Sequence, residues 1–245
     1  MSYITTMGVP SGVIMAADRQ ITQKAQIQTE LPEGRNDNET FILNTIARTY
    51  EPTFAMLKNY ARPISRTVKK LFTIGDNIGV NMGQTLHTKE GIPVSVFMDY
   101  FCRTKSFDDP EIAAKELCNY LHGIDGNMDT IIHLAGYDKT EPDILTPEVY
   151  RISIKENTVF SMKNYGFHYA GYNDYFLQHC EKIDENIFKY SLQDAADICN
   201  FAITMCRTLS KYLDFNSGIS DDIEMIAITH NGIQWIKKAE LKLEG

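Results

Sequence analysis

The sequence predicts an α+β fold in which antiparallel sheets carry helices on their outer faces. Short runs of β-branched and apolar residues are joined by tight turns, and helical patterns come in pairs, so the order is strands, helix pair, strands, helix pair, strands. A Rossmann fold is disfavoured because strands and helices do not alternate one for one, and no G-x-G-x-x-G or G-x-x-x-x-G-K-[ST] motif occurs. One domain over residues 1–245 is expected.

Apolar and alternating runs define the expected elements, and turn residues separate them. Pro10-Ser11-Gly12 joins the first two strands, and Gly75-Asp76-Asn77 joins a later pair. The expected strands are residues 3–9, 13–18, two within 69–83, 128–138, 148–154, 157–162, 165–172, 223–229 and the stretch after His230-Asn231-Gly232. The expected helices are residues 93–104, 108–122, 173–187 and 191–212, the last opening with Ser191 and Asp194 as a capping box.

Composition argues against several partners. The chain has 24 basic and 32 acidic residues, a net charge of −8 and no cluster of Lys or Arg, so neither nucleic acid nor a membrane surface is expected as partner. No run approaches ~18 apolar residues and no export signal is visible, so a cytoplasmic location is expected. The five cysteines and six histidines show no C-x-x-C pair or zinc-ligand spacing. Free thiols and scattered surface histidines are expected, with no metal and no cofactor.

Several positions carry side chains suited to acyl transfer: Ser2 after the initiator Met, Asp18 at the end of the second strand, Lys70 in KKLF, and Asp214 before Ser217-Gly218. The stretches around them resemble the proteasome-type N-terminal-nucleophile hydrolases: GVIMAADRQIT, KKLFTIGDNIGVNMG, IIHLAGYD with EVYRISIKE, and DFNSGISDDIEMIAITHNGIQWI. The N-terminus is most similar to that of the bacterial Anbu proteins, which also have Met, a hydroxyl residue and Tyr before the same spacing to the strand-ending Asp.

The resemblance implies a four-layer αββα sandwich and an amide or peptide hydrolase. Removal of Met1 would free Ser2, whose hydroxyl would attack while its own α-amine, with an ordinary pKa of about 7.7–8.0, accepts the proton. In such a site Lys70 would keep this amine neutral by like-charge repulsion, and Asp18 would hold Lys70 through a charge-assisted hydrogen bond.

The resemblance also assigns supporting roles. Asp214 and Ser217 match the pair that orients the amine in the family. The backbone N–H groups of Gly83 and Gln84 lie where the family places the donor that stabilises the oxyanion.

Spacing selects Ser2 among the nearby hydroxyl residues, because the family keeps sixteen positions between nucleophile and Asp, as from Ser2 to Asp18. Hairpin geometry agrees in outline. If Val9 pairs near Val13, Ser2 and Asp18 lie on one face as diagonal neighbours, and Thr5 points the other way.

Thr6 would share that face but lies inside the strand, so both it and its neighbour Thr5 are interpreted as ordinary strand residues. Three features depart from the family. The nucleophile is Ser rather than Thr, Tyr172 replaces a supporting hydroxyl residue, and residues 23–66 form an inserted segment that would cap the site, shape its pocket or mediate assembly.

Two functions remain open from the sequence. The first is a hydrolase acting on a peptide or small amide, in a homo-oligomeric ring. The second is a non-catalytic ring or scaffold subunit with the same fold. Asp18, Lys70, Asp214 and Ser217 together favour the enzyme, whereas Ser at position 2 and Tyr172 favour the scaffold. The motifs do not specify an ATPase partner.

Overall fold

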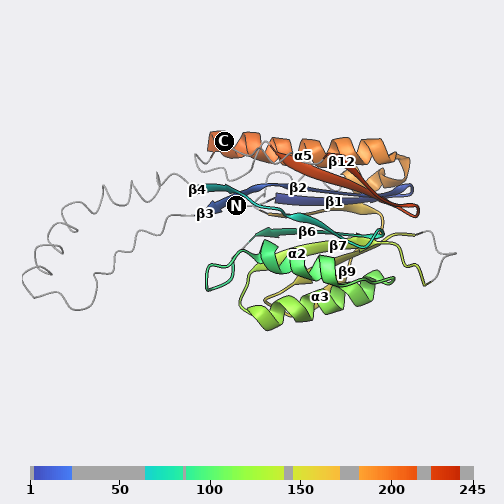
Figure 1. Ribbon diagram of the computed structural model, residues 1–245. Helices are drawn as coiled ribbons and strands as arrows, with labels where there is room; N and C mark the ends of the chain where they lie inside the picture. The colour runs from blue at the N-terminus through green and yellow to red at the C-terminus, as the bar shows by residue number, and fades with distance from the viewer. Residues whose placement is uncertain are drawn as a thin grey trace, which may run out of the picture.

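The computed structural model describes residues 3–23, 64–84, 87–140, 146–171, 182–213 and 222–237. Its body consists of two five-stranded antiparallel sheets, with a two-stranded ribbon, β3–β4, beside them (Figure 1). The first sheet has the order β10-β1-β2-β11-β12: Gly166–Gly171, Tyr3–Val9, Gly12–Asp18, Ile223–Thr229 and Gly232–Lys237. The second has the order β5-β6-β7-β8-β9: Leu71–Ile74, Ile78–Gln84, Thr130–Gly136, Glu148–Ser153 and Thr158–Ser161.

Helices cover the outer faces of the two sheets. The helix α5 (Leu192–Leu213) packs on β1 and β2, whereas α2 (Val94–Thr104) and α3 (Pro110–Ile124) pack on the second sheet (Figure 1). The two sheets face each other, and β6 contacts both β1 and β2. The chain therefore has an α+β fold of two antiparallel sheets, as the order of elements predicted.

Apolar side chains fill the three spaces between these elements. Beneath α5 the core includes Tyr3, Met7, Cys199, Ala202 and Ile203. Between the sheets it includes Ile4, Met15, Leu71, Ile131 and Ile226. Against α2 and α3 it includes Phe72, Met82, Met98, Leu117 and Ile132. Successive residues of β1 alternate between the first two cores, which is the period of two expected for a strand buried on both faces.

Side chains cap two helices as their sequences suggest. Asp109 accepts the N–H groups of Glu111 and Ile112 at the start of α3. At the start of α5, Ser191 and Asp194 form the predicted reciprocal capping box, with the hydroxyl accepting the N–H of Asp194 at 3.1 Å and the carboxylate accepting the N–H of Ser191 at 2.8 Å.

The first hairpin forms where predicted but in a different register. Val9 lies opposite Gly12 and Gly8 opposite Val13, one residue from the expected pairing. The turn has two residues, Pro10 and Ser11, because Gly12 already belongs to the strand with φ 150°, a value that favours glycine.

Two further expectations differ in detail. The predicted helix at 173–187 falls partly outside the described residues, and its end is a helical turn at 182–185 followed by the 3₁₀ helix η1 (Ile187–Lys189). No strand was expected at either end of the inserted segment, but β3 (Gln20–Gln23) pairs with β4 (Ile64–Thr67). The two ends of the insertion therefore meet as neighbouring strands.

Within the described ranges, no helix is long and apolar enough to cross a membrane. The described cysteines, Cys102, Cys118, Cys199 and Cys206, are buried and form no disulfide with one another, and Cys180 lies outside the described residues. In the same part of the chain no group of three or more His, Cys, Asp or Glu residues is arranged to hold a metal ion.

Candidate active site

Asp18 and Lys70 form an ion pair beside the start of β1. Nζ of Lys70 donates to Oδ1 of Asp18 at 2.9 Å, and neither side chain is exposed to solvent. The same oxygen accepts the backbone N–H of Tyr3 at 2.8 Å. Asp18 is the last residue of β2 and Lys70 immediately precedes β5, so the pair links the two sheets next to the residue that follows Ser2. Lys70 is therefore not a surface lysine.

Burial determines the electrostatics of this pair. Removal from water lowers the pKa of Lys70 below its ordinary 10.5, and the charge and hydrogen bond of Asp18 act in the opposite direction. A buried ion pair needs additional hydrogen bonds to offset its loss of hydration, and the N–H of Tyr3 supplies one to the carboxylate. A cation in this position would disfavour protonation of an amine placed near Tyr3.

Gly83 and Gln84 end β6 beside the same pair. The N–H of Met82 donates to the carbonyl oxygen of Lys70 at 3.0 Å. Since N–H groups alternate along a strand, the N–H of Gln84 lies on the same edge of β6 as that of Met82, and the N–H of Gly83 on the edge paired with β7. Gln84 has φ 66°, a left-handed conformation that costs a residue other than glycine about 1–3 kcal/mol. A Cβ atom on Gly83 would lie 3.3 Å from Cγ1 of Ile4, so the sheets approach closely here.

Thr5 and Thr6 are both fully buried inside β1, in agreement with their interpretation as strand residues. The amide of Asn81 donates to the carbonyl oxygen of Thr5 at 2.9 Å. The hydroxyl of Thr6 lies 3.2 Å from Nδ1 of His133 on the second sheet. These contacts tie the middle of β1 to the opposite sheet.

His133 was expected to be a surface residue, and this expectation was wrong. The side chain is wholly buried between the sheets, because it follows Ile131 and precedes Ala135 on the inward face of β7. Burial lowers its pKa to about 3, and electrostatic interactions with His168 and Arg151 act in the same direction. Its Nε2 has no hydrogen-bond partner among the described residues. Its position in the strand alternation was the signal that could have identified it.

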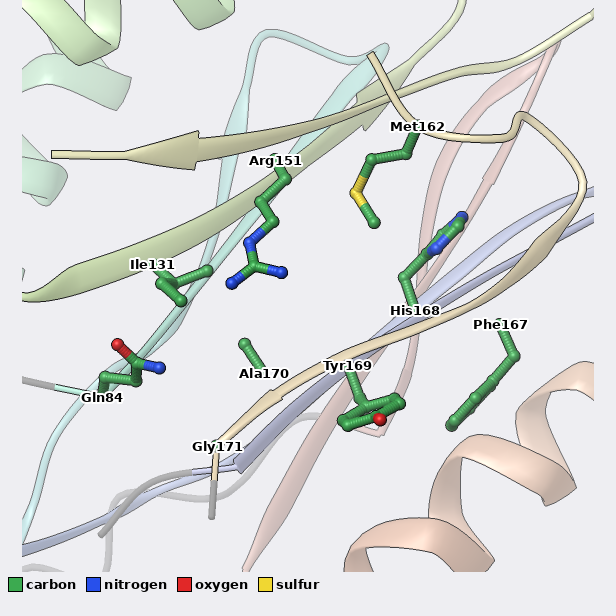
Figure 2. A pocket seen from close by; sticks show the side chains of 9 residues that line it. All are labelled: Gln84, Ile131, Arg151, Met162, Phe167, His168, Tyr169, Ala170 and Gly171. Atoms are coloured by element: carbon green, nitrogen blue, oxygen red, sulfur yellow. The ribbon is translucent and has the colours of Figure 1, made fainter. Parts of the chain in front are cut away.

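A cleft of about 310 Å³ opens between β10 and the second sheet, next to Gln84 (Figure 2). Its lining includes Gln84, Ile131, Arg151, Met162, His168 and Gly171. Gly171 lies opposite Tyr3 in the first sheet, so one end of the cleft is level with the start of β1. The sequence reasoning did not identify this cleft, because it forms only when two strands distant in the chain come together.

The other predicted site residues, Ser2, Asp214 and Ser217, lie outside the described residues, as does Tyr172. The structure thus brings together Asp18 and Lys70, which are 52 positions apart in the chain, and bonds the backbone of Lys70 to Met82, the residue before Gly83. This arrangement places a buried cation beside the start of β1.

Comparisons with known proteins support a fold relationship. No protein-family model matches the chain, and no curated protein matches it. Among solved structures, a Gly-1 mutant of Anbu from Hyphomicrobium sp. strain MC1 is similar with a TM-score of 0.60 and 12% identity, over 100% of this chain and 89% of the other. A second Anbu structure from that strain is similar with a TM-score of 0.57 and 12% identity, over 97% and 88%. The chain therefore has an Anbu-like fold.

Proposed function

We propose that this chain is a proteasome-like amide or peptide hydrolase with a four-layer αββα architecture and Ser2 as its nucleophile. The observation that carries the proposal is the fully buried Asp18–Lys70 ion pair, whose carboxylate also holds the N–H of Tyr3. A lysine is taken out of water at a considerable cost in free energy, and a structural role at a strand end does not require a cation. If Ser2, one residue before Tyr3, is an N-terminal nucleophile, the Lys70 cation would keep its α-amine unprotonated.

The reaction follows from the groups present. After loss of Met1, the α-amine of Ser2 accepts the hydroxyl proton as Oγ attacks the substrate carbonyl carbon, and the tetrahedral oxyanion forms. The C–N bond then breaks, and the departing amine takes the proton from the α-amine. Water, deprotonated by the same α-amine, hydrolyses the resulting ester and regenerates Ser2. The cation of Lys70 keeps the α-amine unprotonated between turnovers.

The geometry favours Gln84 over Gly83 as the oxyanion donor. The N–H of Gln84 is expected on the edge of β6 that faces Lys70, whereas that of Gly83 points toward β7. The left-handed φ of Gln84 is a local strain of the kind that concentrates at functional sites. Asp214 and Ser217 would orient the amine of Ser2, as the family resemblance implies.

Assembly and location complete the proposal. We infer a homo-oligomeric ring, which the sequence resemblance to proteasome-type hydrolases implies and the Anbu-like fold supports, and a cytoplasmic location, since the described cysteines form no disulfide with one another. The two ends of the inserted segment, about residues 23–66, lie in β3 and β4, which pair with each other and form a sheet separate from the two five-stranded ones. Light scattering measures the assembly, and a monomer at micromolar concentration would argue against the ring.

Substitution of Ser2 tests the hydrolase against the scaffold. Ser2→Ala keeps a small residue after Met1, so processing continues and the amine remains, but the attacking oxygen is lost and hydrolysis should fall to background. Ser2→Thr should retain or raise activity, because the β-methyl restricts the hydroxyl to fewer rotamers. If the wild type and both variants assemble alike and none cleaves a broad panel of peptides and amides, the scaffold function replaces the hydrolase.

A further inference from the structure

Arg151 projects into the cleft between β10 and the second sheet without a carboxylate partner among the described residues. It lies on β8 at an inward-facing position, opposite His133 on β7. At this edge the first sheet ends with β10, so the guanidinium faces an open cleft instead of the closed space that buries His133. Two other described arginines are paired, Arg19 with Glu224 and Arg103 with Asp99. A charged side chain in a concave site without its counter-ion is a candidate for ligand recognition.

Several side chains lie around Arg151 in the cleft. Gln84 and Ile131 lie on one side of it and Met162 on the other, whereas the ring of His168 is turned away from it (Figure 2). Among the described residues that line the cleft, none is Asp or Glu. The amide of Gln84 can donate a hydrogen bond beside the guanidinium. Both side chains are exposed, so a ligand can reach them, and a hydrogen bond to the charged guanidinium is stronger than one between neutral groups.

His168 has a fixed proton on one nitrogen. Its Nε2 lies 2.8 Å from the carbonyl oxygen of Lys163, which can only accept, so Nε2 is the donor. Burial lowers the pKa of His168, and the charges of Asp184 and Lys163 act on it in opposite directions. The neutral ring therefore adds no formal charge, and the lining carries the single positive charge of Arg151.

We propose that this cleft binds a carboxylate group, held by a two-point hydrogen bond to Arg151 and by the side-chain amide of Gln84. One guanidinium matches one negative charge in a planar, bidentate geometry, whereas a phosphate dianion would leave one charge uncompensated in a chain of net charge −8. A volume of about 310 Å³ accommodates a group of amino-acid size. The carboxylate is either an acidic side chain of a peptide or the free C-terminus of one.

The cleft and the candidate active site share one residue. The side chain of Gln84 lines the cleft, and its backbone N–H is the proposed oxyanion donor. Gly171, at the same end of the cleft, lies opposite Tyr3. Its φ of 139° is a backbone conformation that favours glycine over other residues. A carboxylate on Arg151 would thus belong to the peptide being cleaved. That final step rests on the proposed function, whereas the binding of a carboxylate does not.

Saturation-transfer NMR on the Ser2→Ala chain tests the binding without turnover. The probes are N-acetylglutamate amide, with a side-chain carboxylate, N-acetylglutamine, with a terminal carboxylate, and N-acetylglutamine amide, which is neutral and of the same shape. At least one acidic probe should bind about tenfold or more tightly than the neutral one, and the tighter of the two identifies the source of the carboxylate. Equal binding of all three probes, or binding of none, would overturn the proposal.

Arginine variants locate the site. Arg151→Gln should weaken the binding of the acidic probe by about tenfold and leave that of the neutral probe unchanged. Arg151→Lys should give a smaller loss of affinity, because it keeps the charge but not the bidentate geometry of the guanidinium. Arg103→Gln, which removes an exposed arginine on α2, is the matched control and should change nothing. Acidic-probe affinity that survives Arg151→Gln would also overturn the proposal.

Kinetics separate this inference from the proposed function. In the chain with Ser2 intact, Arg151→Gln should raise KM for the preferred acidic peptide with little change in kcat. A chain that binds the carboxylate through Arg151 but cleaves nothing would refute the hydrolase and leave the binding site standing. A chain that cleaves neutral and acidic peptides equally, before and after Arg151→Gln, would refute the substrate assignment.

Discussion

The ammonium group of Lys70 lies 2.9 Å from the carboxylate of Asp18 with both side chains fully buried, and this relationship changes what is expected of the pair. An exposed pair contributes about 0–1 kcal/mol, so from the sequence Lys70 would be expected to be replaceable with little loss of stability. In a buried pair, removal of one partner leaves the other charge without compensation. The pair therefore constrains both stability and chemistry.

The first prediction concerns this pair. Lys70→Met should lower the free energy of unfolding by about 3–5 kcal/mol and abolish hydrolysis. The double variant Asp18→Asn, Lys70→Met should recover most of the stability, because no buried charge remains, but none of the activity. Urea denaturation measures the first effect and peptide turnover the second. A double variant as unstable as Lys70→Met would show that the uncompensated charge of Asp18 is not the cause of the lost stability.

The second prediction concerns His133 and pH. Its pKa is about 3 in the folded chain and about 6.5 when unfolded. Between these values the unfolded chain binds a proton that the folded chain does not, so stability decreases as pH falls, by up to about 1.4 kcal/mol per pH unit from this residue. The contribution is fully present above pH 6.5.

Urea denaturation from pH 7 to pH 4 measures this slope in variants. His133→Gln should reduce the pH dependence of the free energy of unfolding by the equivalent of about one bound proton. Thr6→Val, which removes the hydroxyl bonded to His133 but keeps the imidazole, is the control and should retain the slope. A slope unchanged by His133→Gln would assign the acid sensitivity to other groups.

The third prediction compares two glycines. A Cβ atom on Gly79 would lie 2.6 Å from Cδ1 of Ile228 and 2.8 Å from the sulfur of Met15, between the sheets, whereas one on Gly123 in α3 meets no atom within 4 Å. Gly79→Ala should cost about 1–3 kcal/mol through overpacking. Gly123→Ala should stabilise by up to about 1 kcal/mol through helix propensity. Thermal unfolding measures both, and two changes of the same sign would contradict the described packing.

The fourth prediction concerns the inserted segment. Gln23 and Ile64 are opposite each other in the β3–β4 ribbon, so residues 24–63 can be replaced by an Asn-Gly turn without moving either strand. The shortened chain should fold with the same circular dichroism and a melting temperature within about 5 °C, since a shorter loop costs less to close. Aggregation of the shortened chain would show that the body depends on this segment.

The sequence predicted much of the fold because local patterns determine it. The apolar runs of β1 and β2 and the capping box at Ser191 define their elements without help from distant residues. The exact register could not be predicted, because it depends on whether Gly12 belongs to the turn or to the strand. The pairing of β3 with β4 also escaped prediction, since its polar strands, 40 residues apart, have no apolar face that would mark them.

The candidate site was predicted in part. Family resemblance selected Asp18 and Lys70, and the structure brings them into contact. Nothing in the local sequence marks Arg151 or His133, because their surroundings are made by strands from opposite sheets. A charged or titratable residue at an inward position of a strand was the available signal, but the burial of His133 and the cleft beside Arg151 exist only in the folded chain.

The central claim is that Ser2 is a free N-terminal nucleophile, and one mass measurement tests it most directly. An active preparation is treated with an electrophile that captures hydroxyl nucleophiles. The mass of the intact chain is then measured and its N-terminal peptide is sequenced. The account predicts a chain without Met1 that carries one adduct on Ser2, and no adduct on the Ser2→Ala chain. An active, labelled chain that retains Met1, or an adduct on any residue other than Ser2, would contradict it.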